Sequence, residues 1–202
     1  VGILDKIGTF AMIKFCIGLF PEASAWVAPF MIVLALISII YGAAAAIASK
    51  NLLRLVSYTS VSHFGFMVLG IYIFTTQSIN GTIFFMVNHG FSTAALFLAV
   101  GFLIKRRGSA DISDFGGVEK VTPVLAGSVL LAVLSAISLP GMSTFVSEFL
   151  VIAGTWSREP GVAAVAALGI VLAAASGLFF SQRPLAALLT DATATHFTRD
   201  LD

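Results

Sequence analysis

Four ionisable side chains stand within long apolar runs of this 202-residue chain: Lys6, His63, His89 and Glu148. A charged group at the centre of a bilayer costs at least ~2.5–3.5 kcal/mol on insertion scales, so such residues face the interior of a helix bundle and usually serve transport. Amine, imidazole and carboxyl groups can each bind and release a proton. The set therefore predicts a proton relay.

Lys6 lies too deep in its apolar run for its amine to reach water. A lysine balanced between burial and a nearby carboxylate can take up and release a proton under small perturbations. Asp5 is the adjacent residue, although neighbours at i and i+1 do not share a helix face. It therefore either faces another helix or acts on Lys6 from the side. Lys14 lies near the end of the run and can extend to the interface, so we expect a structural role for it.

Hydroxyl groups flank both histidines. His63 ends the run Tyr58-Thr59-Ser60-Val61-Ser62-His63, and His89 is preceded by Thr82 and followed by Thr93. Imidazoles and hydroxyls at mid-depth can hold a chain of water molecules, and imidazole titrates in the useful range. A metal site is disfavoured, because no carboxylate or thiol accompanies the histidines at a suitable spacing.

Glu148 follows the segment Ser138-Leu139-Pro140-Gly141-Met142-Ser143, and hydroxyl residues lie close to it. Proline removes a backbone donor and clashes with the preceding turn, while glycine tolerates a bend. Irregular backbone at membrane depth must line a cavity or be buried in protein, and ion pathways use it. Glu148 is therefore the strongest single candidate site, beside a predicted helix break between about Ser138 and Met142.

The composition indicates the environment of these residues. The chain is 58% hydrophobic and 10% charged, whereas a soluble domain carries about 25% charged residues. Lipid must therefore be its solvent, and we expect an all-α membrane protein. The apolar runs predict six spans: 1–20, 25–49, 56–76, 79–104, 122–156 and 161–181. The fifth is too long for one straight helix, since about 35 residues would extend roughly 52 Å at 1.5 Å each.

Loop charges predict the orientation of the bundle. Lys50, Arg54 and the cluster 105–107 fall on one side, together with Lys120 and Arg183, while Glu22, Arg158 and Glu159 fall on the other. The positive-inside rule places the first group in the cytoplasm. A net charge of +1 without a basic stripe argues against a nucleic-acid partner.

Two further features limit the possible functions. Cys16 is the only cysteine, so an intrachain disulfide, an iron–sulfur cluster and a structural zinc site are not expected. The chain starts at Val1 and enters an apolar run without the basic region of a signal peptide, so we expect it to be part of a longer protein.

Several motifs resemble those of the proton-pumping membrane chains of respiratory NADH:quinone oxidoreductase (complex I), above all chain M and its mitochondrial counterpart, subunit 4. These motifs are the segments 5–10, 58–65, 86–92 and 139–149, in the same order and spacing. The resemblance covers about residues 1–171 and matches the C-terminal portion of that family. Beyond about Leu172 the similarity becomes weaker.

The resemblance implies an antiporter-like fold in which two inverted five-helix repeats each form a half-channel. Residues 1–20 would be the central-axis helix, 25–181 the second half-channel with one discontinuous helix, and 182–202 a flexible polar tail. Lys6 would connect the two halves, His63 and His89 would belong to the second half-channel, and Glu148 would be its terminal proton carrier. Sister chains carry lysine at the Glu148 position, so glutamate here favours chain M.

The resemblance also implies that redox chemistry occurs on partner subunits. Quinone, NADH, FMN and iron–sulfur clusters would bind there, with no cofactor on this chain and no redox catalysis by it. The expected partners are the other complex I membrane subunits, the lipid bilayer, protons and internal water, in the inner (plasma) membrane of a bacterium. The alternatives are a subunit of a Mrp-type cation/proton antiporter or of a membrane hydrogenase, and a non-transporting scaffold or inactive fragment.

Overall fold

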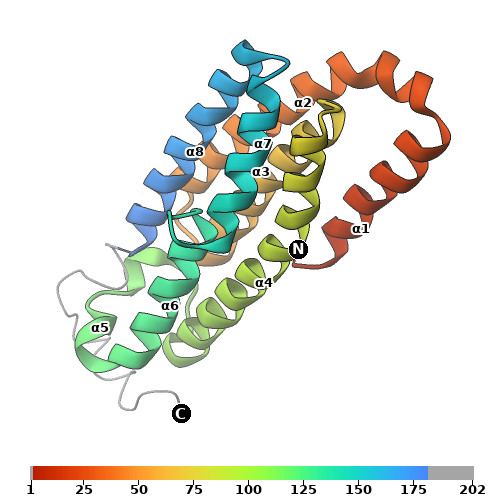
Figure 1. Cartoon of the computed structure of the whole chain (residues 1–202). Coiled ribbons are helices and arrows are strands. Elements are labelled where there is room, and N and C mark those ends of the chain that lie inside the picture. The colour runs from red at the N-terminus through yellow and green to blue at the C-terminus, as the bar shows by residue number, and fades with distance from the viewer. Residues whose placement is uncertain (1, 182–202) are drawn as a thin grey trace.

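A computed structural model describes residues 2–181, so the predicted tail 182–202 lies outside the described residues. The described chain is built from helices and holds no β-strand beyond one isolated bridge. Figure 1 shows the long helices packed side by side, with α1 at the edge of the bundle. The elements are α1 (Leu4–Ala11), the π-helix η1 (Met12–Ile17), α2 (Pro21–Ala48), α3 (Leu52–Tyr72), α4 (Thr76–Arg107), the 3-10 turn η2 (Ile112–Asp114), α5 (Val118–Val121), α6 (Pro123–Ala136), α7 (Ser143–Trp156) and α8 (Pro160–Ser181).

Local sequence signals explain where several helices begin and end. The Asn51 side chain accepts hydrogen bonds from the amides of Leu53 and Arg54 at the start of α3, as an N-cap residue does. Thr75 caps α4 in the same way. Gly108 ends α4 with a left-handed φ of 76°. The third span therefore begins at Leu52 rather than near the predicted Val56, because the cap determines the boundary.

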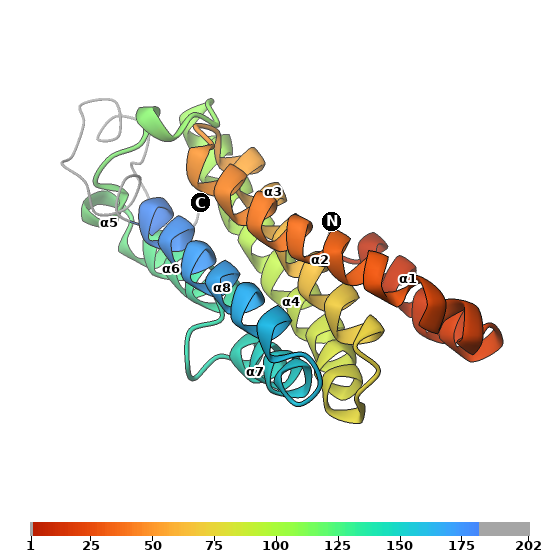
Figure 2. The ribbon, with the colours of Figure 1, turned by 90° about the horizontal axis from the view of Figure 1, so that it is seen from above.

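The predicted helical membrane architecture is confirmed. Within residues 2–181, four helices, α2, α3, α4 and α8, are long and apolar enough to cross a membrane. Along the first predicted span, α1 and η1 follow one another without a gap. Many large apolar side chains point outward, among them Trp26 at 85% exposure and Phe91 at 76%, as expected of lipid-facing helices. Figure 2 shows the helices from above, with α1 and η1 extending beyond the bundle on one side.

The predicted break in the fifth span is also confirmed. Helix α6 ends at Ala136, and α7 begins at Ser143. Between them, Ser138 adopts a φ of 54° and Gly141 a φ of 105°. The Thr144 hydroxyl of α7 donates to the Ser135 carbonyl of α6 at 2.6 Å. The same carbonyl also accepts from the Ser138 amide at 3.2 Å, so both donors replace the i+4 amide that a continuous helix would supply.

Helices α4 and α7 approach each other closely through two glycines. A side chain at Gly81 would come within 2.7 Å of Leu150, and one at Gly154 within 2.5 Å of the Ser78 amide nitrogen. At the same contact, the Thr75 hydroxyl lies 3.2 Å from the Gly154 carbonyl. Small residues allow membrane helices to pack at such short range. The half-helix that carries Glu148 is thereby held against α4.

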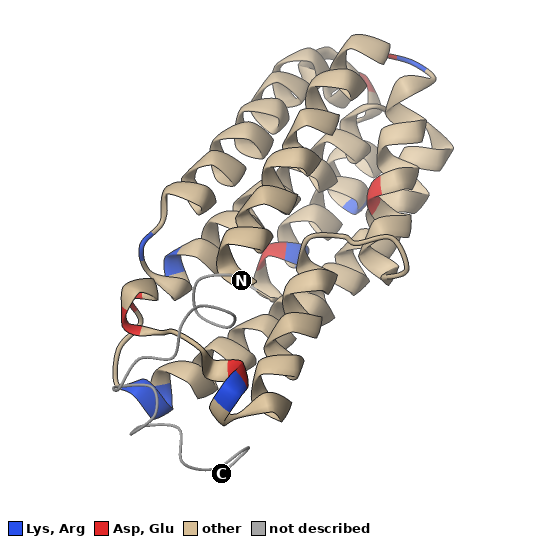
Figure 3. Cartoon of the chain, turned by 90° about the vertical axis from the view of Figure 1, so that its left-hand side faces the viewer, with Lys and Arg blue, Asp and Glu red and all other residues tan. Residues whose placement is uncertain are grey.

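The connectors gather at two opposite ends of the bundle. At one end, the Leu52 amide donates to the Ala110 carbonyl and the Ile112 amide donates to the Lys50 carbonyl. These bonds join the α2–α3 and α4–α5 connectors. At the other end, Arg158 donates to the Ile73 carbonyl at 3.0 Å, which joins the α3–α4 and α7–α8 connectors. Figure 3 shows charged residues near both ends of the ribbon and a few between them.

Two apolar clusters fill the interior, and a polar layer separates them along α3 and α4. One cluster includes Val56 and Leu96, and the other includes Phe66 and Phe85. His63 lies between Val56 and Phe66 in the sequence of α3, and His89 occupies the corresponding interval in α4. The buried polar side chains around them are Thr59, Ser60, Ser62, Thr82, Ser92 and Thr93. The polar residues thus form a layer at mid-depth.

Candidate functional site

Lys6 on α1 is the first member of the polar layer. Its side chain is buried, with the residue 8% exposed. The amine donates to Asp5 Oδ1 at 2.8 Å and lies 2.5 Å from His89 Nδ1. Of the two possibilities for Asp5, the structure selects the contact with Lys6. A carboxylate in the first turn of a helix also interacts favourably with the helix dipole.

His89 on α4 connects Lys6 to the interior. Its Nδ1 faces the Lys6 amine, and its Nε2 lies 3.1 Å from the Thr93 hydroxyl. An ammonium group can only donate a hydrogen bond, so a charged Lys6 requires Nδ1 of His89 to accept. The neutral imidazole then carries its proton on Nε2 and donates a hydrogen bond from there to the Thr93 hydroxyl. Residue Thr93 lies one turn after His89, which is why its hydroxyl can reach the ring.

The two histidines are neighbours across α3 and α4. The ring centroids of His63 and His89 are 5.0 Å apart, at an angle of 76°. The Phe85 ring packs against both, with centroid distances of 5.7 Å and 6.0 Å. Phe85 thus packs against both imidazoles, which are buried.

Glu148 on α7 is the deepest carboxylate of the described chain. Its Oε1 lies 3.6 Å from Nε2 of His63, and the side chains of both residues are 4% exposed. This separation is slightly longer than a hydrogen bond. Within the described residues, Nε2 of His63 has no hydrogen-bond partner. A small movement of either side chain would therefore make or break a direct contact.

All four predicted site residues lie in one buried row. Its spatial order is Lys6, His89, His63 and Glu148, and the residues come from α1, α4, α3 and α7. Prediction from the sequence did not include Thr93 or Asn88 among the site residues, although both are close to His89 in the sequence. Asn88 donates to the Ser147 hydroxyl at 2.8 Å. Its position directly before His89, as a polar residue within an apolar run, was the available signal.

Lys14 does not belong to this row. Lys14 is exposed and lies in the last turn of η1, nearer to the end of the helical segment than Lys6 is. This position is consistent with the expected structural role. Among residues 2–181, no three His, Cys, Asp or Glu side chains are grouped as a metal would require.

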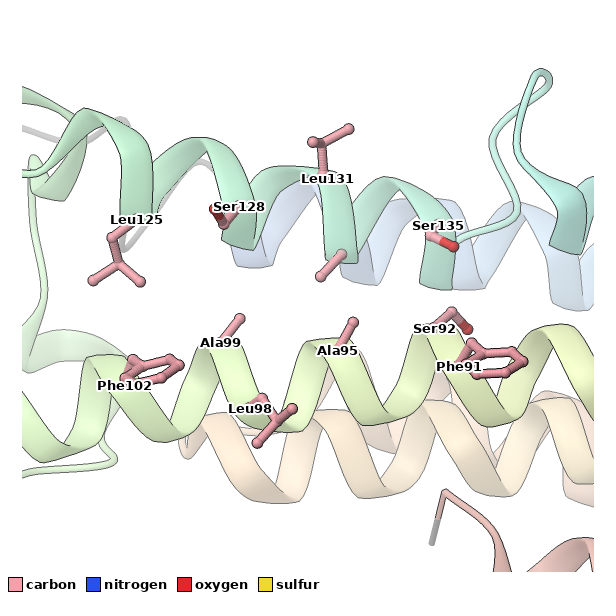
Figure 4. A pocket seen from close by; sticks show the side chains of 11 residues that line it. Phe91, Ser92, Ala95, Leu98, Ala99, Phe102, Leu125, Ser128, Leu131 and Ser135 are labelled. Atoms are coloured by element: carbon pink, nitrogen blue, oxygen red, sulfur yellow. The ribbon is translucent and has the colours of Figure 1, made fainter. Parts of the chain in front are cut away.

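A groove runs between α4 and α6 from the neighbourhood of His89. Its volume is about 580 Å³. It is lined by Phe91, Ser92, Ala95, Leu98, Ala99, Phe102, Leu125, Ser128, Leu131, Ala132 and Ser135. Figure 4 shows Ser92 and Ser135 at the same end of this groove, on facing helices. The Ser92 hydroxyl lies 3.4 Å from the His89 carbonyl, so the groove ends within one helical turn of the polar layer.

A discontinuous membrane helix with a buried carboxylate, next to a row of titratable groups, defines an antiporter-like membrane subunit. Comparison with known families agrees. Residues 1–173 match the family described as NADH:quinone oxidoreductase/Mrp antiporter, TM. The chain belongs to this family.

Individual relatives show the same relationship. NADH-quinone oxidoreductase subunit M of Mycobacterium tuberculosis is 48% identical over 183 residues, covering 91% of this chain and 33% of that protein. Respiratory complex I from Thermus thermophilus contains a chain with a TM-score of 0.88 and 32% identity, covering 95% of this chain and 42% of that one. The Mrp complex from Dietzia sp. contains one with a TM-score of 0.83 and 25% identity, covering 93% of this chain and 35% of that one. The chain thus spans about a third of the length of the curated relative.

Proposed function

We propose that this chain is part of a proton-translocating membrane subunit of NADH:quinone oxidoreductase. Lys6, His89, His63 and Glu148, with internal water, would carry protons through the membrane. The observation that carries this proposal is the row of four buried titratable groups, which come from four different helices and lie next to one another. Each such group is costly in a bilayer, and a transport role explains why they lie together.

The contacts suggest how a proton would move along the row. Lys6 and His89 are in direct hydrogen-bond contact, and His89 reaches Thr93, whose hydroxyl can both donate and accept. The 3.6 Å between His63 and Glu148 requires a small rotation or a bridging water, since it exceeds a hydrogen bond. Proton transfer would be controlled at this step, because a slight displacement of α7 changes the distance between Glu148 and His63.

The chain itself would perform no redox chemistry. Electron transfer from NADH to quinone, with FMN and iron–sulfur clusters, would take place on partner subunits, and the coupling would act through contacts between membrane subunits. The bacterial relatives favour the plasma membrane of a bacterium as the location.

A second candidate is a subunit of a Mrp-type cation/proton antiporter. The structural similarity to the Dietzia complex favours it, with a TM-score of 0.83. The greater identity to subunit M favours the first candidate. Purification of the full-length protein from its native membrane distinguishes them, because only a complex I subunit co-purifies with NADH dehydrogenase activity.

Two substitutions in the full-length protein, assembled in its complex, test the relay. We expect Lys6→Ala and Glu148→Gln each to lower proton pumping into vesicles roughly tenfold or more, because each removes a group that exchanges protons. Quinone reduction should fall as well, since pumping and electron transfer are coupled. Lys14→Ala is the matched control and should leave both rates near the wild type. Equal losses for Lys6→Ala and Lys14→Ala, or normal pumping in Glu148→Gln, would contradict the proposed relay.

A further inference from the structure

No continuous helix connects α7 to α6, although the Thr144 hydroxyl donates to the Ser135 carbonyl of α6. The irregular residues between Ala136 and Ser143 interrupt the fifth span, and two of them have a left-handed φ. Backbone hydrogen bonds of one helix therefore do not set the height or rotation of the other. Contacts between α7 and its neighbours must do this, and Glu148 depends on them.

Asn88 on α4 makes such a contact with the first turns of α7. Its Nδ2 donates to the Ser143 carbonyl at 3.1 Å and to the Ser147 hydroxyl at 2.8 Å. A carbonyl oxygen can only accept, so the amide nitrogen must be the atom that faces Ser143. An amide nitrogen has two hydrogens, and both are used on α7. The Ser147 hydroxyl is held in addition by its own donation to Ser143 at 3.2 Å.

The two residues that make this contact are sequence neighbours of two relay residues. Asn88 precedes His89 on α4, and Ser147 precedes Glu148 on α7. Successive residues of a helix point about 100° apart, so Asn88 and Ser147 can face each other while their neighbours face the polar layer. The contact therefore fixes the height of Glu148 relative to the histidines. The closest approach of Glu148 to His63 is 3.6 Å, so a small change of height alters it.

We propose that Asn88 is a positioning residue that holds the α7 half-helix in the register at which Glu148 faces His63. This inference rests on the proposed relay and names a determinant of it. The Asn88 amide itself carries no proton along the row. It acts through α7, at the end of the α4–α7 interface opposite to the close approach of Gly154 and Ser78.

The experiment compares variants of the full-length protein in its assembled complex. Asn88→Ala removes both donors, and Ser147→Ala removes one acceptor while Asn88 stays in place. Asn80→Ala is the matched control, because Asn80 is an exposed asparagine on the same helix. Two quantities are measured at equal amounts of assembled complex: proton pumping, and the infrared carboxyl stretching band of Glu148. Loss of this band in Glu148→Gln identifies it.

We expect Asn88→Ala to lower pumping roughly threefold to tenfold, the range that corresponds to the loss of interhelical hydrogen bonds in membranes. We also expect the Glu148 band to shift in Asn88→Ala and Ser147→Ala and to stay unchanged in Asn80→Ala. A purely structural role would change the amount of complex and leave the band in place. If Asn88→Ala assembles and its Glu148 band is unchanged, the inference is wrong. If Asn88→Ala does not assemble, an unchanged Glu148 band in Ser147→Ala overturns the inference instead. If the band is unchanged but Glu148→Gln does not pump, only the inference about Asn88 is wrong and the proposed relay is retained. If Glu148→Gln pumps normally, the relay and the inference about Asn88 are both wrong.

Discussion

Lys6 makes the contacts on which the first step of the proposed relay would depend. Its amine lies between a carboxylate and an imidazole, Asp5 Oδ1 at 2.8 Å and His89 Nδ1 at 2.5 Å. The carboxylate stabilises the charged amine, while burial opposes it. The imidazole can accept a proton from the amine. The proposed relay would need a cation that can lose its proton to His89, whereas a permanent positive charge would preserve only the contact with Asp5.

Lys6→Arg separates these two requirements. Arginine keeps the positive charge beside Asp5 but does not deprotonate in proteins. We expect proton pumping in Lys6→Arg to fall about as far as in Lys6→Ala, measured in vesicles at matched assembly. Lys14→Arg serves as the control and should pump normally. Near wild-type pumping in Lys6→Arg would mean that the charge alone is needed.

The broken helix depends on two backbone conformations that most residues avoid. Ser138 and Gly141 have φ values of 54° and 105°. Values near that of Gly141 are almost restricted to glycine, because a Cβ atom strains the backbone there. Pro140 prevents the helix from continuing through the same segment. The break is therefore encoded by a few adjacent residues.

Gly141→Ala tests this origin of the break. No atom lies within 4 Å of a Cβ built at Gly141 or at Gly127, which lies inside α6. A difference between the two alanine variants therefore reflects backbone conformation alone. Gly141→Ala should destabilise the protein by about 1–3 kcal/mol, whereas Gly127→Ala should stabilise it by about 0.5–1 kcal/mol. The readout is the temperature at which half of the purified complex loses activity; equal shifts in the two variants would rule out strain at Gly141.

For the molecule as a whole, charge is distributed between two ends. Residues 105–107 end α4, and the connector that follows them is joined by backbone hydrogen bonds to the connector with Lys50. These cations therefore lie at one end of the bundle. Arg158 contacts the opposite connector, where its guanidinium lies 6.0 Å from the Phe74 ring. The positive-inside rule then assigns the cytoplasm to the end with Lys50.

Labelling with a membrane-impermeant thiol reagent tests this orientation. In the full-length protein, single cysteines replace Lys50 and Arg158 in a background in which Cys16, which is exposed, is changed to Ser and cysteines outside this chain are replaced too. We expect Lys50→Cys to react only from the cytoplasmic side and Arg158→Cys only from the other side. The parent Cys16→Ser protein gives the background. Reaction of both from the same side would show the topology to be wrong.

The sequence alone determined the membrane spans, the helix break and the residue types of the site. These features depend on single residues and their sequence neighbours. Transfer of an apolar side chain into lipid is favourable at any position in the chain, and Pro140 interrupts a helix in any surrounding. Some helix ends differ from the predicted span ends where a cap residue determines them, as Asn51 does at the start of α3. The cost of a buried charge is also a property of single residues, which is why Lys6 and Glu148 could be recognised without a structure.

Only the tertiary structure decided how these residues meet. Lys6 and His89 are 83 positions apart and in contact, and the order of the row differs from the order of its members along the chain. That order depends on how each helix is rotated and how closely it packs; between α4 and α7, Gly81, Gly154 and Asn88 make the close contacts. Hydropathy carries no information on such rotations, because it sums over a helix, whereas a proton relay requires particular atoms of different helices at hydrogen-bond distance.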